Sequence, residues 1–156
     1  MRVRLGLVGV LILLMFPSPV WGDEVSSLGL PDFSAGYSVP RAGELEELPE
    51  PVRNQLLALR MMLDAGFDYD EFDDLTELWN RESDWLTGAA NPNSSARGIP
   101  QAMTSLHEGT DTEEWLTSAE RQIEWGLDYI RRRYGSPSKA LAKWLERERL
   151  EGEGWY

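Results

Sequence analysis

The middle of the chain has the hydrophobic period of an amphipathic helix. At about 100° per residue, one stripe of this segment is apolar, and it holds Leu75, Leu78, Trp79, Trp85 and Leu86. Acidic side chains point roughly the opposite way, namely Asp73, Glu77 and Asp84. The pattern predicts a helix from about Asp70 to Leu86, with Asp70 as the N-cap and acidic residues in the first turn, where the helix dipole favours them.

Glu82 is the exception on this stripe, because it is a carboxylate among apolar residues. The same count places it about 20° from Leu75. A lone carboxylate on an apolar face is costly unless it is paired or protonated. Desolvation would raise its pKa, which is what a general acid working near neutral pH needs. The alternative interpretation is a structural glutamate that caps a loop or pairs with an arginine, since structural ion pairs also perturb pKa values.

A second helical pattern precedes this segment. It opens at Pro51, since proline is favoured in the first turn of a helix, and Gly66 is a typical C-terminal stop. Its apolar residues recur at helix spacing, at Val52, Leu56, Leu59 and Leu63. After the Glu82 segment, residues 88–98 form a loop of turn formers. Gly98 then restarts the chain into a short helix, and a polar loop follows over about 104–113.

Two further helices are expected toward the C-terminus. Thr117 and Glu120 form a capping box, and the apolar stripe that follows holds Ile123, Gly126, Leu127, Ile130 and Tyr134. Gly126 within that stripe predicts close contact with another element. Gly135 ends this helix, and Ser136-Pro137 begins the next, through Leu141, Trp144 and Leu145. Without clear strand alternation or an internal repeat, the sequence predicts an all-α domain of about four to six helices.

Residues 1–22 have the organisation of a secretory signal peptide. Arg2 and Arg4 supply a basic start, the apolar run over 5–16 is short for a membrane span, and Gly22 offers a small-residue cleavage position. An uncleaved anchor is the alternative, which the length disfavours. Residues 23–50 are rich in Gly, Pro, Ser and Glu, as in a flexible acidic linker. The expected organisation is therefore a leader (1–22), a linker (23–50), an accessory helix (51–66) and a main domain (67–156).

Charge and composition exclude several function classes. The net charge of −12 becomes −14 once the two leader arginines are removed, which argues against binding to nucleic acid or to anionic membrane surfaces. The chain has no cysteine and a single histidine, His107, so thiol catalysis and a usual zinc site are excluded. Of its seven tryptophans, core packing is the default for Trp79, Trp85, Trp125 and Trp144, while Trp115 and Trp155 lie near loops and could line a groove.

Short motifs in a fixed order give the chain a family resemblance. Glu82-Ser83 is followed by Asn91-Pro92 and then by Gly98-Ile99-Pro100-Gln101. This order resembles the soluble lytic transglycosylase superfamily, which has a lysozyme-like α-helical fold and a Glu-Ser pair at a helix end, followed by a Gly-hydrophobic-x-Gln motif. The segments 122–130 and 133–137 and the terminal Gly154-Trp155-Tyr156 are similar to one exported bacterial branch of that family. The resemblance covers roughly residues 67–156.

The resemblance assigns roles to individual positions. Glu82 corresponds to the catalytic glutamate, and Ser83 would orient or hydrogen-bond near the scissile sugar. The other matched positions would line the glycan cleft: Asn91, Arg97, Gly98 and Gln101. Many relatives also carry an Ala-Tyr-Asn segment whose tyrosine faces the glutamate, and the corresponding residues 140–144 lack it. Tyr156 would either replace that tyrosine or be a frayed chain end.

The activity implied by the resemblance is cleavage of the β-1,4 bond between N-acetylmuramic acid and N-acetylglucosamine in peptidoglycan, with formation of a 1,6-anhydro end. No second acid shares the Glu82 stripe, and Asp128 is only a remote candidate, which suits substrate assistance. Neither metal nor cofactor is required. The protein would work in the periplasm or cell envelope of a bacterium, without stable membrane insertion after leader cleavage. Its N-terminal arm could dock an envelope or secretion-machinery partner. The alternatives are a lysozyme-type hydrolase and a catalytically silent peptidoglycan-binding module.

Overall fold

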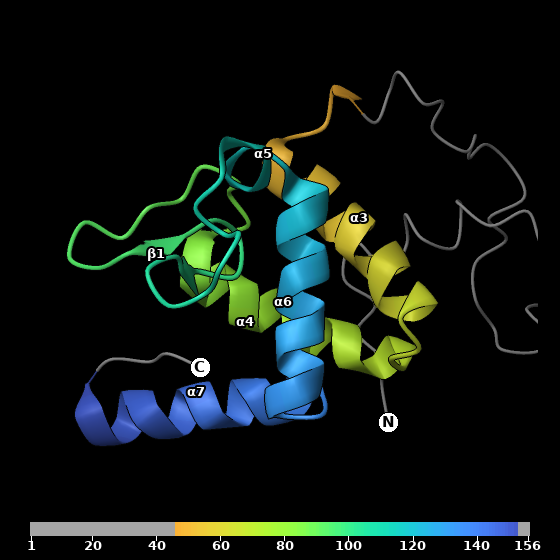
Figure 1. Cartoon of the computed structure of the whole chain (residues 1–156). Helices are drawn as coiled ribbons and strands as arrows, with labels where there is room; N and C mark the ends of the chain where they lie inside the picture. Colours follow the sequence, from red (N-terminus) through yellow and green to blue (C-terminus); the bar gives the residue numbers. More distant parts are fainter. Residues whose placement is uncertain (1–45, 153–156) are drawn as a thin grey trace, which may run out of the picture. The chain divides into compact units, whose positions relative to one another are not determined.

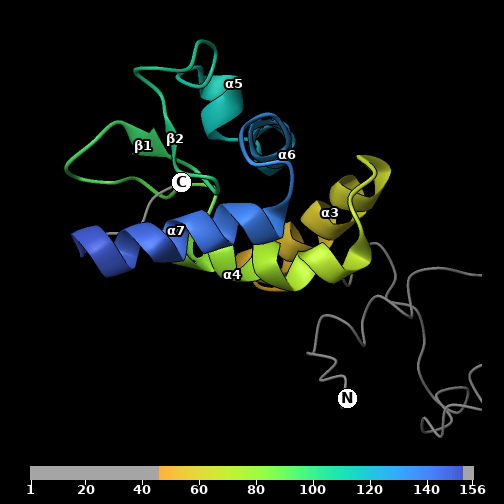
Figure 2. The same ribbon diagram turned by 90° about the horizontal axis from the view of Figure 1, so that it is seen from below.

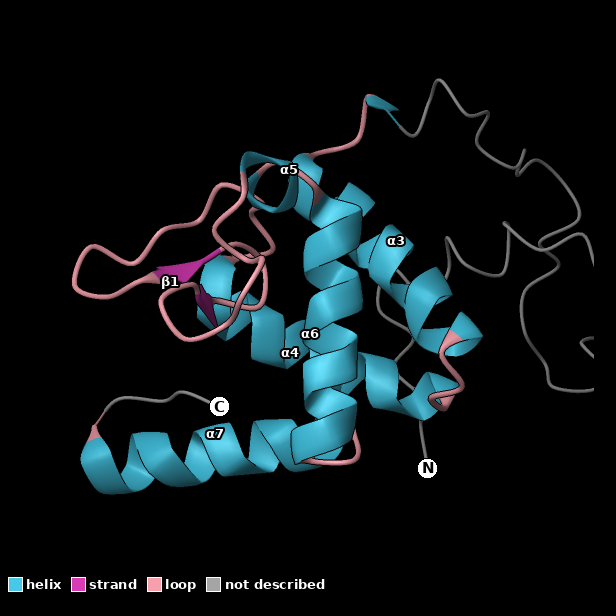
Figure 3. Cartoon of the chain, in the orientation of Figure 1, coloured by secondary structure: helices cyan, strands magenta, loops and turns pink. Residues whose placement is uncertain are grey.

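The computed structural model describes residues 46–152. The chain divides into two units, residues 1–48 and 49–156, and nearly all described residues belong to the second. The expected leader and most of the linker lie outside the described residues, as do Trp155 and Tyr156. The described part of the second unit has five α-helices, a short 3-10 helix and a two-stranded hairpin (Figure 3). The prediction of an all-α domain with four to six helices is confirmed.

Helix α3 (Glu50–Asp64) is part of this unit. It packs against α4 and α6, so the helix expected as an accessory element belongs to the same unit as they do. Pro51 lies in its first turn, and Gly66 has a φ of +82° just beyond its end. The helix predicted from the spacing of four apolar residues is present; of these residues Leu59 is buried, and Val52, Leu56 and Leu63 are half-buried. The buried face is formed by Asn54, Ala58, Leu59 and Met62.

Helix α4 (Phe72–Ser83) is shorter than the predicted helix at both ends. Asp70 is not an N-cap, because it lies inside the preceding 3-10 helix η2 (Tyr69–Glu71). At the other end Asp84 and Trp85 adopt left-handed conformations with φ of 51° and 62°, so the helix stops before Trp85. This turn still buries Trp85, but it leaves Leu86 40% exposed, and the prediction that Leu86 lies on the helix stripe is wrong.

The segment after α4 forms a small hairpin rather than the predicted short helix. Strand β1 (Ala96–Arg97) pairs antiparallel with β2 (Ala102–Met103). The connection is a tight turn with positive φ at both ends, 73° at Gly98 and 49° at Gln101. Glycine adopts such values at little cost, whereas a residue with a side chain does so rarely. Strands of two residues are too short to show an alternating pattern.

The C-terminal half contains α5 (Glu113–Leu116), α6 (Ala119–Arg133) and α7 (Pro137–Glu151). Helix α5 lies where a polar loop was expected to end, and Thr112 caps it. The side chain of Ser118, rather than that of Thr117, caps α6. Ser136 caps α7 as predicted. Helix α7 packs against α4, and Figure 2, which looks down the axis of α6, shows α7 drawn over α4. Figure 1 shows α6 running steeply down to the start of α7.

The close contact predicted at Gly126 is confirmed. A Cβ atom there would lie 2.6 Å from Cζ2 of Trp79 and 3.0 Å from Cβ of Pro100. The glycine therefore lets α6 approach both the buried face of α4 and the turn of the hairpin. No helix in the stretch 46–152 is long and apolar enough to cross a bilayer.

Candidate active site

Glu82 lies in the last turn of α4, beside the core residues of the same helix. Burial raises the pKa of its carboxyl from 4.5 to about 7. Its Oε1 atom is buried without a hydrogen-bond partner among the described residues. Within residues 46–152, Glu82 forms no ion pair with an arginine. The arginine pairing that a structural role for this glutamate would involve is therefore not seen there. A carboxyl group with this pKa is present in both its acid and its base form near neutral pH.

Trp144 of α7 lies next to this carboxyl group. Its proximity lowers the pKa of Glu82, against the larger effect of burial. Trp144 is only 7% exposed, and its indole Nε1 has no hydrogen-bond partner within the described residues. The donor and the acceptor are thus close enough to interact electrostatically, but they do not form a hydrogen bond of normal geometry. An ionised Glu82 would strengthen this contact, because hydrogen bonds to charged acceptors are shorter and stronger.

Ser83 joins the end of α4 to the hairpin turn. Its hydroxyl donates to the carbonyl oxygen of Ile99 at 2.8 Å and accepts a hydrogen bond from the Trp85 backbone N–H at 3.1 Å. The side chain is buried, and its hydrogen bonds are made within the protein. Ser83 therefore fixes the position of the 98–101 turn relative to Glu82, and any effect that it has on a substrate is exerted through that turn.

Gln122 of α6 is a site residue that the sequence analysis did not identify. Its Oε1 accepts a hydrogen bond from Ile99 N at 2.9 Å, and its Nε2 donates to carbonyl oxygens of Trp115 and Leu116 at 3.1 and 3.2 Å. A Cβ atom on Gly98 would lie 2.5 Å from this amide. Gly98 is therefore required both for its positive φ and for the close approach of Gln122. The sequence did hold a signal for Gln122, because this polar residue lies four positions before Gly126, beside the predicted apolar stripe.

The remaining predicted positions lie on and around the hairpin. Gln101 closes the turn, since its Nε2 donates to Gly98 O at 2.9 Å. Asn91 is exposed, and its Oδ1 accepts a hydrogen bond from Asn93 N at 2.8 Å. Arg97 donates to backbone carbonyls, including that of Asn91 at 3.2 Å. The structure thus joins Ser83, the residue after Glu82, to the turn that contains Gly98 and Gln101. Asn91 and Arg97 form the adjoining loop, and Tyr156 lies outside the described residues.

A second carboxylate beside Glu82 is not found in the described part of the chain. Asp128 is exposed on α6, where it forms an ion pair with Arg132. It lines two surface pockets, and neither of them includes Glu82. No other acid contributes to the raised pKa of Glu82. Within residues 46–152, no group of three or more His, Asp or Glu side chains is placed to hold a metal ion.

Half-buried aromatic rings line one side of α6 and the loop before α5. Trp125 stacks on Tyr129 with ring centroids 5.1 Å apart, and His107 meets both rings edge-on. Tyr134 meets Tyr129 at 6.2 Å. We call His107, Trp125, Tyr129 and Tyr134 the α6 aromatic strip. Trp125 is half-buried rather than a core residue. Trp115 is 5% exposed, and it contributes to the lining of a surface pocket, as expected of a residue near a groove.

Comparison with known proteins gives no match: no family model fits the chain, and neither the curated proteins nor the solved structures contain a significant match to it.

Proposed function

We propose that this protein is a peptidoglycan lytic transglycosylase with a lysozyme-like domain, in which Glu82 is first the general acid and then the general base. The observation that carries the proposal is the state of Glu82: a carboxyl group whose Oε1 atom is buried without a hydrogen-bond partner in the described residues and whose pKa is about 7. The next residue, Ser83, hydrogen-bonds to a turn that Gln122 and Gly98 fix in place. The ordered motifs that contain these residues support the same family.

The chemistry follows from a single carboxyl group. Protonated Glu82 gives its proton to the glycosidic oxygen of the leaving sugar. The N-acetyl oxygen of muramic acid attacks its own C1, which replaces the second carboxylate of ordinary glycosidases. Ionised Glu82 then takes the proton from the 6-hydroxyl of the same sugar, and that oxygen bonds to C1, which breaks the bond between C1 and the N-acetyl oxygen and closes the 1,6-anhydro ring. Glu82 is protonated again at the end, and no water is consumed.

The state of Glu82 suits both steps. A pKa of about 7 leaves comparable amounts of acid and base near neutral pH. Trp144 lies where its indole N–H can stabilise the ionised carboxylate between the two steps. The α6 aromatic strip supports glycan binding, because aromatic rings present large apolar faces with polar edges. The exported location and the peptidoglycan substrate are part of the same proposal.

Product chemistry tests the proposal. The purified protein and its Glu82→Gln variant are incubated with peptidoglycan sacculi, and the released muropeptides are analysed by mass spectrometry. We expect 1,6-anhydro ends from the wild type and no release by the variant. Ordinary reducing ends would instead identify a lysozyme-type hydrolase. Binding to sacculi by both proteins without release by either would identify a silent binding module.

A further inference from the structure

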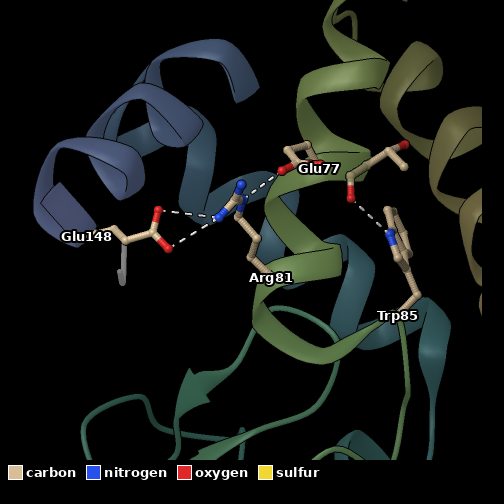
Figure 4. Close-up of polar contacts among 5 residues, drawn as sticks. Glu77, Arg81, Trp85 and Glu148 are labelled. Atoms are coloured by element: carbon tan, nitrogen blue, oxygen red, sulfur yellow. Dashed lines mark hydrogen bonds and ion pairs between the residues drawn. The ribbon is translucent and has the colours of Figure 1, made fainter. Parts of the chain in front are cut away.

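Arg81 precedes Glu82 in the sequence, but its guanidinium group is held elsewhere. Its Nε donates to Glu77 Oε1 at 2.7 Å, one turn back on α4. Its Nη1 lies 3.4 Å from both carboxylate oxygens of Glu148 on α7. Figure 4 shows the guanidinium between the two acids, one from each helix. Two negative charges from different helices thus fix one positive charge at the α4–α7 contact.

The same guanidinium lies over the indole ring of Trp144, with Cζ 4.8 Å from the ring centroid. A cation in this position is attracted to the face of the ring. Trp144 also lies next to Glu82. Arg81 and Glu82 therefore meet the same indole ring, yet they form no ion pair with each other in the described residues. The charge of Arg81 is not among the causes of the shift in the pKa of Glu82. The arginine side chain is long and flexible, so without Glu77 and Glu148 it would be free to turn toward the neighbouring carboxylate.

We propose that Glu77 and Glu148 are positioning residues that hold the Arg81 guanidinium on Trp144 and away from the Glu82 carboxylate. The inference rests on the proposed function, because holding the charge away matters only if Glu82 must stay protonated to act as an acid. An opposite charge within about 4–6 Å lowers the pKa of a carboxyl group by about 1–3 units. An arginine paired with Glu82 would therefore leave it ionised at neutral pH.

The charged groups on the elements packed against α4, apart from Glu148, are Glu50, Arg53, Arg60, Asp64, Asp70, Glu71, Lys139, Lys143, Glu146, Arg147, Arg149 and Glu151. None of them is a cause of the shift in the pKa of Glu82. Glu77 and Glu148 are themselves exposed, at 47% and 46% of their side-chain surface. Single exposed ion pairs contribute little to stability, so removing both acids should leave the fold intact. This makes the inference testable without unfolding the protein.

The test compares three variants by carbon-13 NMR titration of the Glu82 carboxyl group, which does not depend on activity. In Glu77→Gln/Glu148→Gln we expect the pKa of Glu82 to fall by about one unit or more. Adding Arg81→Met should restore it, because methionine still packs on Trp144 without a charge. The control is Asp73→Asn/Glu146→Gln, which removes the same number of charges from the same two helices and should leave the pKa unchanged.

Three results would overturn the inference: an unchanged pKa in the double variant, an equal fall in the control, or no recovery when Arg81 is replaced. If the protein has transglycosylase activity, the alkaline limb of its pH profile should move with the pKa of Glu82 in each variant. A protein with no activity but with the expected pKa changes would retain this inference and contradict the proposed function. An active protein without the pKa changes would support the proposed function and contradict this inference.

Discussion

The carboxyl group of Glu82 and the indole N–H of Trp144 lie close together at the contact of α4 with α7, and each has a buried polar atom without a hydrogen-bond partner in the described residues. Burial raises the pKa of Glu82, and Trp144 opposes this effect. Buried polar groups without partners are uncommon in proteins and often mark functional sites. Together, burial and Trp144 leave the Glu82 carboxyl group partly protonated and partly ionised at neutral pH.

Replacement of Trp144 by phenylalanine should raise the pKa of Glu82 further. Phenylalanine keeps an aromatic ring under Arg81 but removes the N–H that favours the ionised carboxylate. Carbon-13 NMR titration of the Glu82 carboxyl group measures the change directly. A lower pKa in this variant would mean that water has entered the site, and it would contradict the role given to the indole N–H.

The stability of the protein should depend on pH through Glu82. The folded pKa of about 7 lies above the ordinary value of 4.5, so the folded protein keeps a proton that the unfolded chain releases. The resulting stabilisation is complete below pH 4.5 and is lost as the pH rises through 7, by roughly 3 kcal/mol in total.

The Glu82→Gln variant has no ionisable group at this position, so its free energy of unfolding should lack the pH-dependent contribution of Glu82. Urea unfolding of both proteins near pH 4.5 and near pH 8 measures the free energy of unfolding in each state. We expect the wild type to lose stability relative to the variant over this interval. Equal losses in the two proteins would assign the pH dependence to other groups.

Gly126 should not tolerate a larger residue. Gly126→Ala places a methyl group 2.6 Å from Trp79 and 3.0 Å from Pro100, and overpacking of this kind costs about 1–3 kcal/mol. Gly88→Ala is the matched control, since a Cβ atom there meets nothing within 4 Å. Thermal unfolding should show a lower midpoint for the first variant alone.

Gln122 should be required for the hairpin turn. Gln122→Met removes the acceptor for Ile99 N and the donor to Trp115 O, and each buried group left unpaired costs about 1–3 kcal/mol. We expect lower stability and faster amide exchange at Ile99. Unchanged exchange at Ile99 would show that the turn holds its shape without Gln122.

The α6 aromatic strip should contribute to glycan binding. Trp125→Ala removes the ring that stacks on Tyr129, and the loss of one aromatic contact corresponds to about a tenfold change in affinity. Sedimentation with sacculi measures the effect in a Glu82→Gln background, where no cleavage interferes. Leu106→Ala, at an exposed apolar position outside the strip, is the control and should bind as before.

The burial of Glu82 was predictable because helix period alone places it beside Leu75, and α4 keeps that register through Ser83. The exit of the chain from this helix was not predictable from local sequence. Two successive left-handed residues are held there by Ser83 and by Asn54, whose Nδ2 donates to Trp85 O from 31 residues away. Long-range hydrogen bonds of this kind leave no periodic signal.

The hairpin was missed for a related reason. Its strands are two residues long, and its turn depends on Gln122, which comes from a helix later in the chain. Gly98 was predicted as a site residue from a motif, whereas its physical requirement became visible only when the Gln122 amide was found against it. The helical elements were therefore mostly predictable, and the geometry that places the turn beside Glu82 was not.

Digestion of sacculi in water labelled with oxygen-18 tests the central claim most directly. A transglycosylase takes the ring-closing oxygen from the sugar itself, so the released ends should be 1,6-anhydro, one water lighter than hydrolytic ends and free of label. Glu82→Gln should release nothing. Labelled reducing ends, or release that persists without the Glu82 carboxyl group, would contradict the account.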